Sequence, residues 1–68
     1  SPLNDYTASA KWYRKAANQG HSGSQHSLGD YYFFGRGVPK DINQAKKWYR
    51  KAANQGHPIA IGKLRALQ

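Results

Sequence analysis

The sequence predicts an all-α fold built from repeated pairs of helices. Its clearest sign is an internal repeat: residues 11–21 read KWYRKAANQGH, and residues 47–57 read the same eleven letters 36 positions later. A self-match at this period is the signature of a repeat array. Apolar residues also recur with a helical period around both copies, and only short turns separate the helical segments. Because stacked repeats offer an extended surface instead of a closed pocket, we first expect a binding module.

The first helix is expected over residues 5–19. It begins at Asp5 and Gly20 ends it, by analogy with the second copy of the repeat. At about 100° per residue, one arc of this helix collects its bulky and small residues. The members of that arc are Tyr6, Ser9, Trp12, Tyr13, Ala16 and Ala17. We therefore expect Trp12 to be largely buried.

The second helix is expected over residues 21–34, followed by a connector over residues 35–40 whose glycines and proline break the helix. Its apolar face comprises Ser24, Leu28, Tyr31 and Tyr32. Gly29 lies in mid-helix, where glycine costs about 1 kcal/mol relative to alanine. Such a glycine is tolerable where a neighbouring helix packs directly against its backbone. In the connector, Gly35 and Gly37 supply backbone freedom.

The third helix, over residues 41–55, has the clearest pattern. Asp41 can cap its first turn with Gln44 three residues later, and Gly56 follows its last turn. Its apolar arc comprises Ile42, Ala45, Trp48, Tyr49, Ala52 and Ala53. Trp48 is thus expected to be buried at a place equivalent to that of Trp12.

The fourth helix is expected over residues 58–67, with Pro58 at its first position. Only a glycine and a histidine follow Gln19 and Gln55 before the next helix, so those neighbours must be antiparallel. The four helices form one domain over residues 1–68, which we expect to be a piece of a longer protein or a processed product.

Composition narrows the function classes. The chain of 68 residues has 11 Lys and Arg against 3 Asp and Glu, a net charge of +8 that attracts anionic partners. With no cysteine, neither disulfides nor a thiolate metal site is available. No apolar stretch is long enough to span a bilayer, and no signal peptide is visible.

The order of the spaced residues resembles the Sel-one-like repeat, a relative of the tetratricopeptide repeat. The matching positions are Leu28, Gly29, Tyr32, Gly35, Gly37, Val38, Asp41, Ala45, Trp48, Tyr49, Lys51, Ala52, Ala53, Gln55, Gly56, His57 and Ala60. The resemblance implies an α-solenoid of antiparallel helix pairs that acts as a scaffold or adaptor for other proteins. It further implies a role that is common in bacteria and a chain that is not itself an enzyme. No cofactor is expected. The compartment stays open, with a soluble periplasmic protein and a secreted bacterial protein as the two alternatives.

Some positions depart from the family pattern. Ser24 stands where the family usually has alanine, Arg65 where Gly29 would recur, and Gln68 where Tyr32 would recur. The last helix is therefore either a cap or the start of a repeat that was cut, and Arg65 argues for a cap. Two repeats are fewer than usually suffice for stability, which favours self-association through exposed repeat ends.

A basic face recurs with the repeat. Its members are Lys11, Arg14, Lys15, Lys47, Arg50 and Lys51. One interpretation is a solvated outer surface, and the other is a stripe that binds acidic protein, nucleic acid or phospholipid. Nucleic-acid binding favours aromatic residues among the exposed basic ones, whereas the Trp-Tyr pairs here fall on the expected buried side. The alternative function is therefore binding of an anionic polymer or membrane surface through the outer helices.

The expected partner-binding residues are His26, Asp30, Phe33 and Phe34. Phe33 lies alongside His26 on the helical wheel, away from the apolar face, and can serve as an aromatic anchor on the inner helix face. The alternative is that the phenylalanines pack under the connector near Val38.

Catalysis and metal binding have little support. There is no Cys or Glu, and two of the three Asp fall at helix starts. His26 and Asp30 could share a metal ion at their spacing of four, but two ligands do not make a site. His21 and His57 begin their helices, and we expect a structural role for both in the turns.

Overall fold

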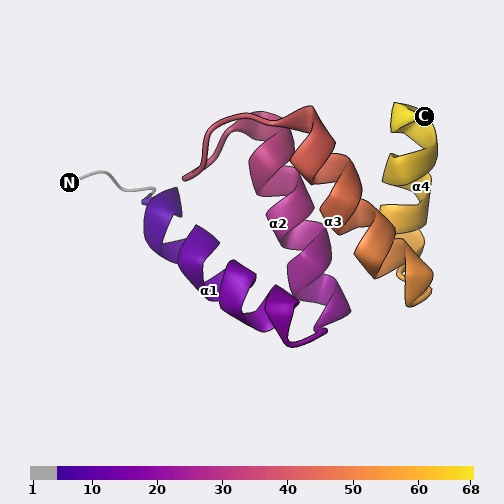
Figure 1. Cartoon of the computed structure of the whole chain (residues 1–68), viewed down its shortest axis with the longest axis horizontal. Coiled ribbons are helices and arrows are strands. Elements are labelled where there is room, and N and C mark those ends of the chain that lie inside the picture. Colours follow the sequence, from indigo (N-terminus) through magenta and orange to yellow (C-terminus); the bar gives the residue numbers. More distant parts are fainter. Residues whose placement is uncertain (1–4) are drawn as a thin grey trace.

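The computed structural model describes residues 5–68, so residues 1–4 of the expected domain lie outside it. Four helices follow one another along the chain: α1 (Tyr6–Asn18), α2 (Ser22–Phe34), α3 (Ile42–Asn54) and α4 (Pro58–Leu67). No strand occurs in this part of the chain, and the all-α prediction is confirmed. Each helix begins and ends within one residue of its expected range. The helices form a row from α1 at one end to α4 at the other (Figure 1).

Local signals set the starts and ends of the repeated helices. The Asp5 carboxylate accepts a hydrogen bond from the Thr7 amide at 3.0 Å. The Asp41 carboxylate does the same for the Gln44 amide, at 3.1 Å. Each side chain satisfies an amide that the helix cannot satisfy. After α1 and α3, the chain turns through Gly20 and Gly56 with φ of 94° and 87°. These are left-handed conformations that favour glycine.

Helix α2 lies between α1 and α3, and α4 packs against α3. The closest approach is at Gly29, where a Cβ atom would lie 2.6 Å from the ring of Tyr49. No side chain fits at that distance, which explains a glycine inside a helix. Tyr49 and Leu28 are the largest fully buried side chains of the described residues.

The apolar core forms where α1, α2 and α3 meet. Ala17, Leu28 and Trp48 are buried together, and Tyr13 and Tyr32 pack against them. The core thus combines the small side chain of Ala17 with the bulky ones of Leu28 and Trp48. This arrangement lets the helices approach closely.

The prediction that Trp12 is buried is wrong. Trp12 is 70% exposed, whereas its repeat equivalent Trp48 is 5% exposed. The reason is the place of each helix in the row. Helix α2 covers the side of α3 that carries Trp48, while no described helix covers the corresponding side of α1. Ala10, which lies outside the expected arc, is buried in α1 instead.

The connector after α2 returns toward the start of α1 (Figure 1). Gly35 ends α2 with a φ of 72°, and Gly37 has a φ of 67°. A side chain on Gly37 would collide with the backbone of Tyr6, and the Arg36 guanidinium lies 5.5 Å from the Tyr6 ring centre. The connector therefore closes one end of the α1–α2 pair.

Candidate partner-binding site

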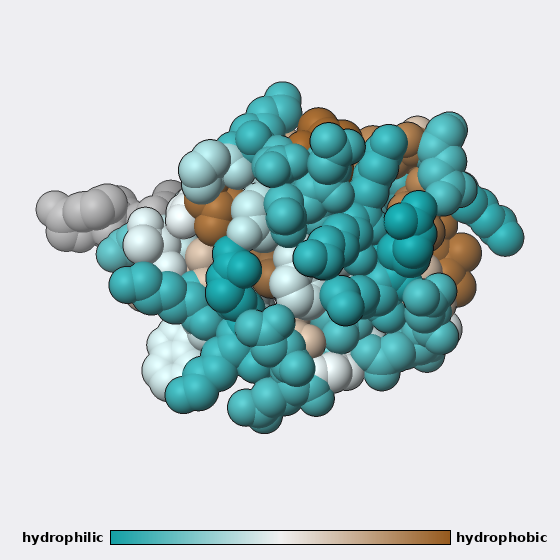
Figure 2. All heavy atoms as spheres, viewed as in Figure 1, coloured by the Kyte–Doolittle hydropathy of each residue, from teal (hydrophilic) through white to brown (hydrophobic). Residues whose placement is uncertain are grey.

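A shallow hollow of about 150 Å³ lies on the side of the molecule that α2 and α4 share. We call it the inner hollow. It is lined by Asp30, Phe33, Phe34, Tyr49, Lys63, Ala66 and Leu67. Most of these groups are apolar, and the only charges come from one carboxylate and one ammonium. Figure 2 shows hydrophilic side chains over most of the viewed face, with hydrophobic ones gathered beside α4 and along the upper edge.

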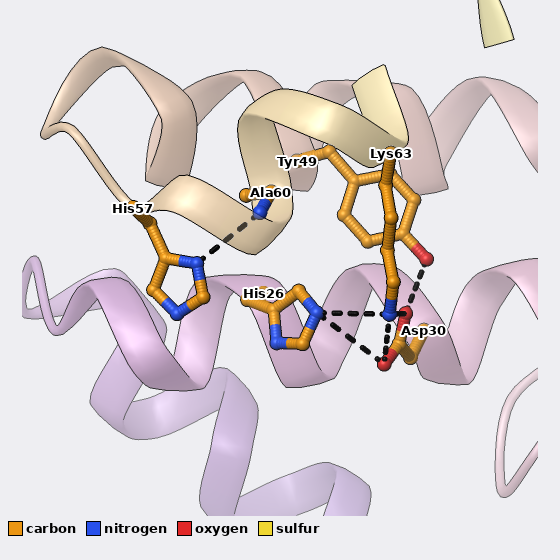
Figure 3. Close-up of polar contacts among 6 residues, drawn as sticks. All are labelled: His26, Asp30, Tyr49, His57, Ala60 and Lys63. Carbon is orange, nitrogen blue, oxygen red and sulfur yellow. Dashed lines mark hydrogen bonds and ion pairs between the residues drawn. The ribbon is translucent and has the colours of Figure 1, made fainter. Parts of the chain in front are cut away.

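Asp30 is the centre of a polar network at one side of the inner hollow (Figure 3). The Lys63 ammonium donates to both Asp30 carboxylate oxygens, at 2.7 and 2.9 Å. The Tyr49 hydroxyl donates to the same carboxylate. His26 Nε2 lies 3.6 Å from Asp30 Oδ2. One carboxylate of α2 thus connects side chains of α3 and α4.

The network shifts the ionisation of its members. Burial alone would raise the pKa of Asp30. The hydrogen bonds from Lys63 and Tyr49, with His26 and the charge of Lys63 acting in the same direction, outweigh it and lower that pKa. Burial and the hydrogen bond to Asp30 raise the pKa of the Tyr49 hydroxyl. At neutral pH, Asp30 is therefore an anion paired with the Lys63 cation.

His26 takes part in this network as a neutral ring. Its Nε2 lies 2.9 Å from the Lys63 ammonium, which can only donate, so Nε2 accepts and the proton sits on Nδ1. The His57 ring stacks on His26 with centres 4.8 Å apart. Burial lowers the pKa of His26, and the nearby charges of Lys63 and His57 lower it further against the opposing effect of Asp30.

The four residues expected to bind a partner do not act alike. The structure brings His26 and Asp30 together, but it engages both in contacts within the chain. Phe33 is partly buried and lines the inner hollow. Phe34 is 55% exposed, meets Phe33 edge to face at 4.9 Å, and has the Arg36 guanidinium 4.5 Å from its ring centre. The phenylalanines are the part of the expected site that stays accessible.

The place beside His26 and Asp30 that a metal ion would take is filled by the Lys63 ammonium. No group of three metal-binding side chains occurs within residues 5–68.

His21 and His57 lie where the sequence placed them, in the turns. His21 Nδ1 accepts a hydrogen bond from the Ser24 amide at 3.0 Å, and His57 Nδ1 accepts one from the Ala60 amide at 3.2 Å. The buried Ser24 hydroxyl also lies 2.8 Å from His21 Nδ1. This serine–histidine contact belongs to the start of α2.

All six residues of the basic face are exposed. Arg14 donates to the Tyr32 hydroxyl, which ties one guanidinium to α2. The other notable contacts are local: the Lys15 ammonium lies 5.7 Å from the Trp12 ring centre, and Lys51 lies at the same distance from Trp48. The lysines and arginines of this face otherwise extend into water.

Sequence reasoning missed three residues of the inner hollow: Lys63, Ala66 and Leu67. One signal pointed to Lys63. Asp30 is the acid that does not stand at a helix start. A carboxylate among aromatic residues needs a cation beside it, because an unpaired charge there is costly. The pattern did not show that this cation would come from α4.

Comparisons with known proteins agree with the fold. Residues 2–21 and 22–57 match the family described as Sel1 repeat. The chain is similar to the crystal structure of a Sel1 repeat protein from Oxalobacter formigenes, with a TM-score of 0.89 and 47% identity, over 91% of this chain and 47% of that one. It is also 43% identical over 41 residues to proteins of rat and mouse named DAP3-binding cell death enhancer 1. That match spans 60% of this chain but only 8% of each of those proteins.

Within residues 5–68, no helix has both the length and the apolar character needed to cross a membrane.

Proposed function

Because this chain belongs to the Sel1 repeat family, we propose that it binds a segment of another protein in the inner hollow. Sel1 repeats are generally protein-interaction modules. The proposed role is that of a scaffold or adaptor without chemistry of its own. It extends the general role of the family to a particular surface of this chain.

The observation that carries the proposal is the apolar lining of the inner hollow. Phe33, Phe34 and Leu67 present hydrophobic surface there, and Tyr49 lies beneath. Accessible apolar surface of this kind marks interaction sites, and aromatic anchors supply much of the binding energy of an interface. A volume of about 150 Å³ is enough for one apolar side chain or a benzene-sized ring. The partner is thus expected to insert one apolar side chain between α2 and α4.

The polar network supports this role by holding the hollow in shape. Lys63 and Asp30 fix α4 relative to α2, so the apolar walls are in place before a partner arrives. Preorganisation of this kind reduces the entropy that binding must overcome.

The test is capture of partner proteins by the folded chain, with the captured proteins identified and their affinities measured. We expect Phe33→Ala and Leu67→Ala to weaken binding at least tenfold, as loss of anchor residues does. The matched control is Lys47→Glu with Lys51→Glu, on the outer face, which is expected to leave the affinity nearly unchanged.

Salt separates the proposal from binding of anionic polymers. Binding driven by phosphate contacts weakens steeply as salt rises, whereas an apolar anchor does not. A partner that is lost on charge reversal or at high salt, but retained by Phe33→Ala and Leu67→Ala, would contradict the proposal.

A further inference from the structure

The Arg36 guanidinium, in the connector between α2 and α3, lies over two aromatic rings. Its central carbon is 4.5 Å from the ring centre of Phe34 and 5.5 Å from that of Tyr6. The backbone holds it there, because the Arg36 amide donates to the Tyr31 carbonyl at 2.8 Å. The Tyr6 ring is itself fixed by an edge-to-face contact with Tyr31, with centres 5.4 Å apart. The charge of Arg36 therefore has a defined place, although the residue is exposed.

This guanidinium has no anionic partner in the described part of the chain. Asp30 pairs with Lys63, and no ion pair there involves Arg36. The other two acids, Asp5 and Asp41, cap helices. An aromatic face attracts a cation through its π electrons, so the N–H groups at the edge of the guanidinium plane stay available. A planar fork of donors of this kind matches a carboxylate, which it can bind through two parallel hydrogen bonds.

Phe34 joins this arginine to the inner hollow. Its side chain lines the hollow, its ring contacts the guanidinium, and it meets Phe33 edge to face with centres 4.9 Å apart. A side chain inserted into the hollow would thus pack within one aromatic ring of the Arg36 charge. Since an extended chain advances about 3.3 Å per residue, an acid about two or three residues from that side chain reaches the guanidinium.

Charge complementarity favours an acidic occupant at this end of the hollow. The two charges that line the hollow cancel, because the Lys63 ammonium donates to both oxygens of Asp30. The connector adds two cations that have no ion-pair partner among the described residues: Arg36 and Lys40, whose Cβ atom lies against Gly35. The field of the whole chain, with its charge of +8, acts in the same direction.

We propose that Arg36 binds an acidic side chain of the partner segment, within about three residues of the apolar side chain that enters the inner hollow. The inference rests on the proposed function and adds the chemistry that selects among partners. The apolar contact supplies affinity, whereas Arg36 discriminates against segments that bring no acid or that place a cation beside it. The class of partner is thus an acidic peptide segment with one apolar anchor.

The probe is a displayed library of peptides that carry one fixed leucine between random residues, selected on the full chain and on two variants. Arg36→Gln removes the guanidinium of the proposed contact. Arg50→Gln removes the same group from the outer face of α3, where Arg50 is exposed, and is the matched control. Circular dichroism checks that all three chains are folded.

We expect the peptides selected on the natural chain to be enriched in aspartate and glutamate close to the leucine. The enrichment is expected to disappear on Arg36→Gln and to persist on Arg50→Gln. In one selected peptide, changing the acid to its amide is expected to weaken binding about tenfold on the natural chain and less than about twofold on Arg36→Gln. A purely structural role of Arg36 would weaken the binding of both peptides equally, so this cycle isolates the contact.

The outcomes separate this proposal from the proposed function. Selected peptides that show no acid enrichment, or that lose it on Arg50→Gln as well, would overturn the role of Arg36 and leave the inner hollow as the binding site. If no peptide is selected, or if selected peptides bind Phe33→Ala as tightly as the natural chain, both proposals fail. An oligothymidylate that binds more tightly than any selected peptide, and that depends on Arg36, would make nucleic acid the occupant and also overturn the proposal.

Discussion

At Gly29, the absence of a side chain sets the distance between α2 and α3. A carbon atom there would lie 2.6 Å from the buried Tyr49 ring, whereas at Gly62 in α4 no atom lies within 4 Å of the same addition. Both glycines stand inside helices. Comparing the same substitution at both positions therefore separates the effect of helix propensity on stability from the effect of packing.

We expect Gly29→Ala to destabilise the fold by about 1–3 kcal/mol through overpacking. Gly62→Ala is expected to stabilise it by about 0.5–1 kcal/mol, because alanine loses less conformational freedom in a helix. Urea unfolding followed by circular dichroism measures both. Stabilisation of the fold by both variants would show that Gly29 is not at a close contact.

A larger side chain at Gly29 sharpens the comparison. We expect Gly29→Leu to lower the melting temperature more than Leu64→Ala does. The first change forces the central helices apart, and the second removes atoms from a terminal helix with one main neighbour. Equal melting temperatures would contradict the prediction.

The helical period of the apolar residues predicted much of the core, including Leu28, Trp48 and Tyr49, because each lies on the apolar face of its helix. They could not predict the exposure of Trp12. The eleven residues around Trp12 and Trp48 are identical, so no local signal distinguishes them. Burial here depends on which helix lies next to each copy, and that information is outside the segment.

At the level of elements, helix limits were predictable because their signals are local. Asp5, Asp41, His21 and His57 each accept a hydrogen bond from an amide two or three residues later. The inner hollow was only half predictable for the opposite reason. Phe33 could be found on the wheel of its own helix, whereas Lys63 approaches Asp30 from an element 33 residues away in sequence.

The contact of α4 with α2 is expected to weaken as the pH falls. The His26 ring is faced by Asp30 of α2, Tyr49 of α3, Lys63 of α4 and His57 at the start of α4. Its pKa is lowered from the ordinary 6.5, so the unfolded chain binds this proton more readily than the folded one. The His26 contribution to stability is thus full above pH 6.5 and is lost as the pH falls through the folded pKa.

A second loss is expected below pH 3.8, the ordinary pKa of the Asp30 carboxyl, since the folded state lowers that value too. Melting temperatures of the natural chain and His26→Gln, measured from pH 8 to 3, separate the two steps. The variant keeps a polar side chain without a titrating ring. Only the loss of stability at the higher pH, which we assign to His26, is therefore expected to disappear. Identical pH profiles for the two proteins would rule out His26 as the origin of the loss of stability at the higher pH.

At the scale of the whole molecule, stability is expected to be highest in the middle of the row. Helix α2 packs on both α1 and α3, and α3 packs on both α2 and α4, whereas α1 and α4 each have one main neighbour. In repeat arrays, stability follows such nearest-neighbour contacts.

Hydrogen exchange measures this distribution directly. We expect amides of α2 and α3 to exchange most slowly and those of α1 and α4 to open first, as weakly contacted segments do. Uniform protection along the chain would instead indicate that all four helices open together.

Two identical peptides in one molecule also give spectroscopy an internal reference. Residues 11–21 and 47–57 experience the same buffer, temperature and tumbling, and every covalent feature of the eleven residues is shared. A difference in chemical shift or relaxation between matched atoms of the two segments therefore reports the surroundings alone. Subtracting one spectrum from the other isolates the contribution of those surroundings, namely the neighbouring helices and the flanking residues, with no random-coil table or separate peptide needed for calibration.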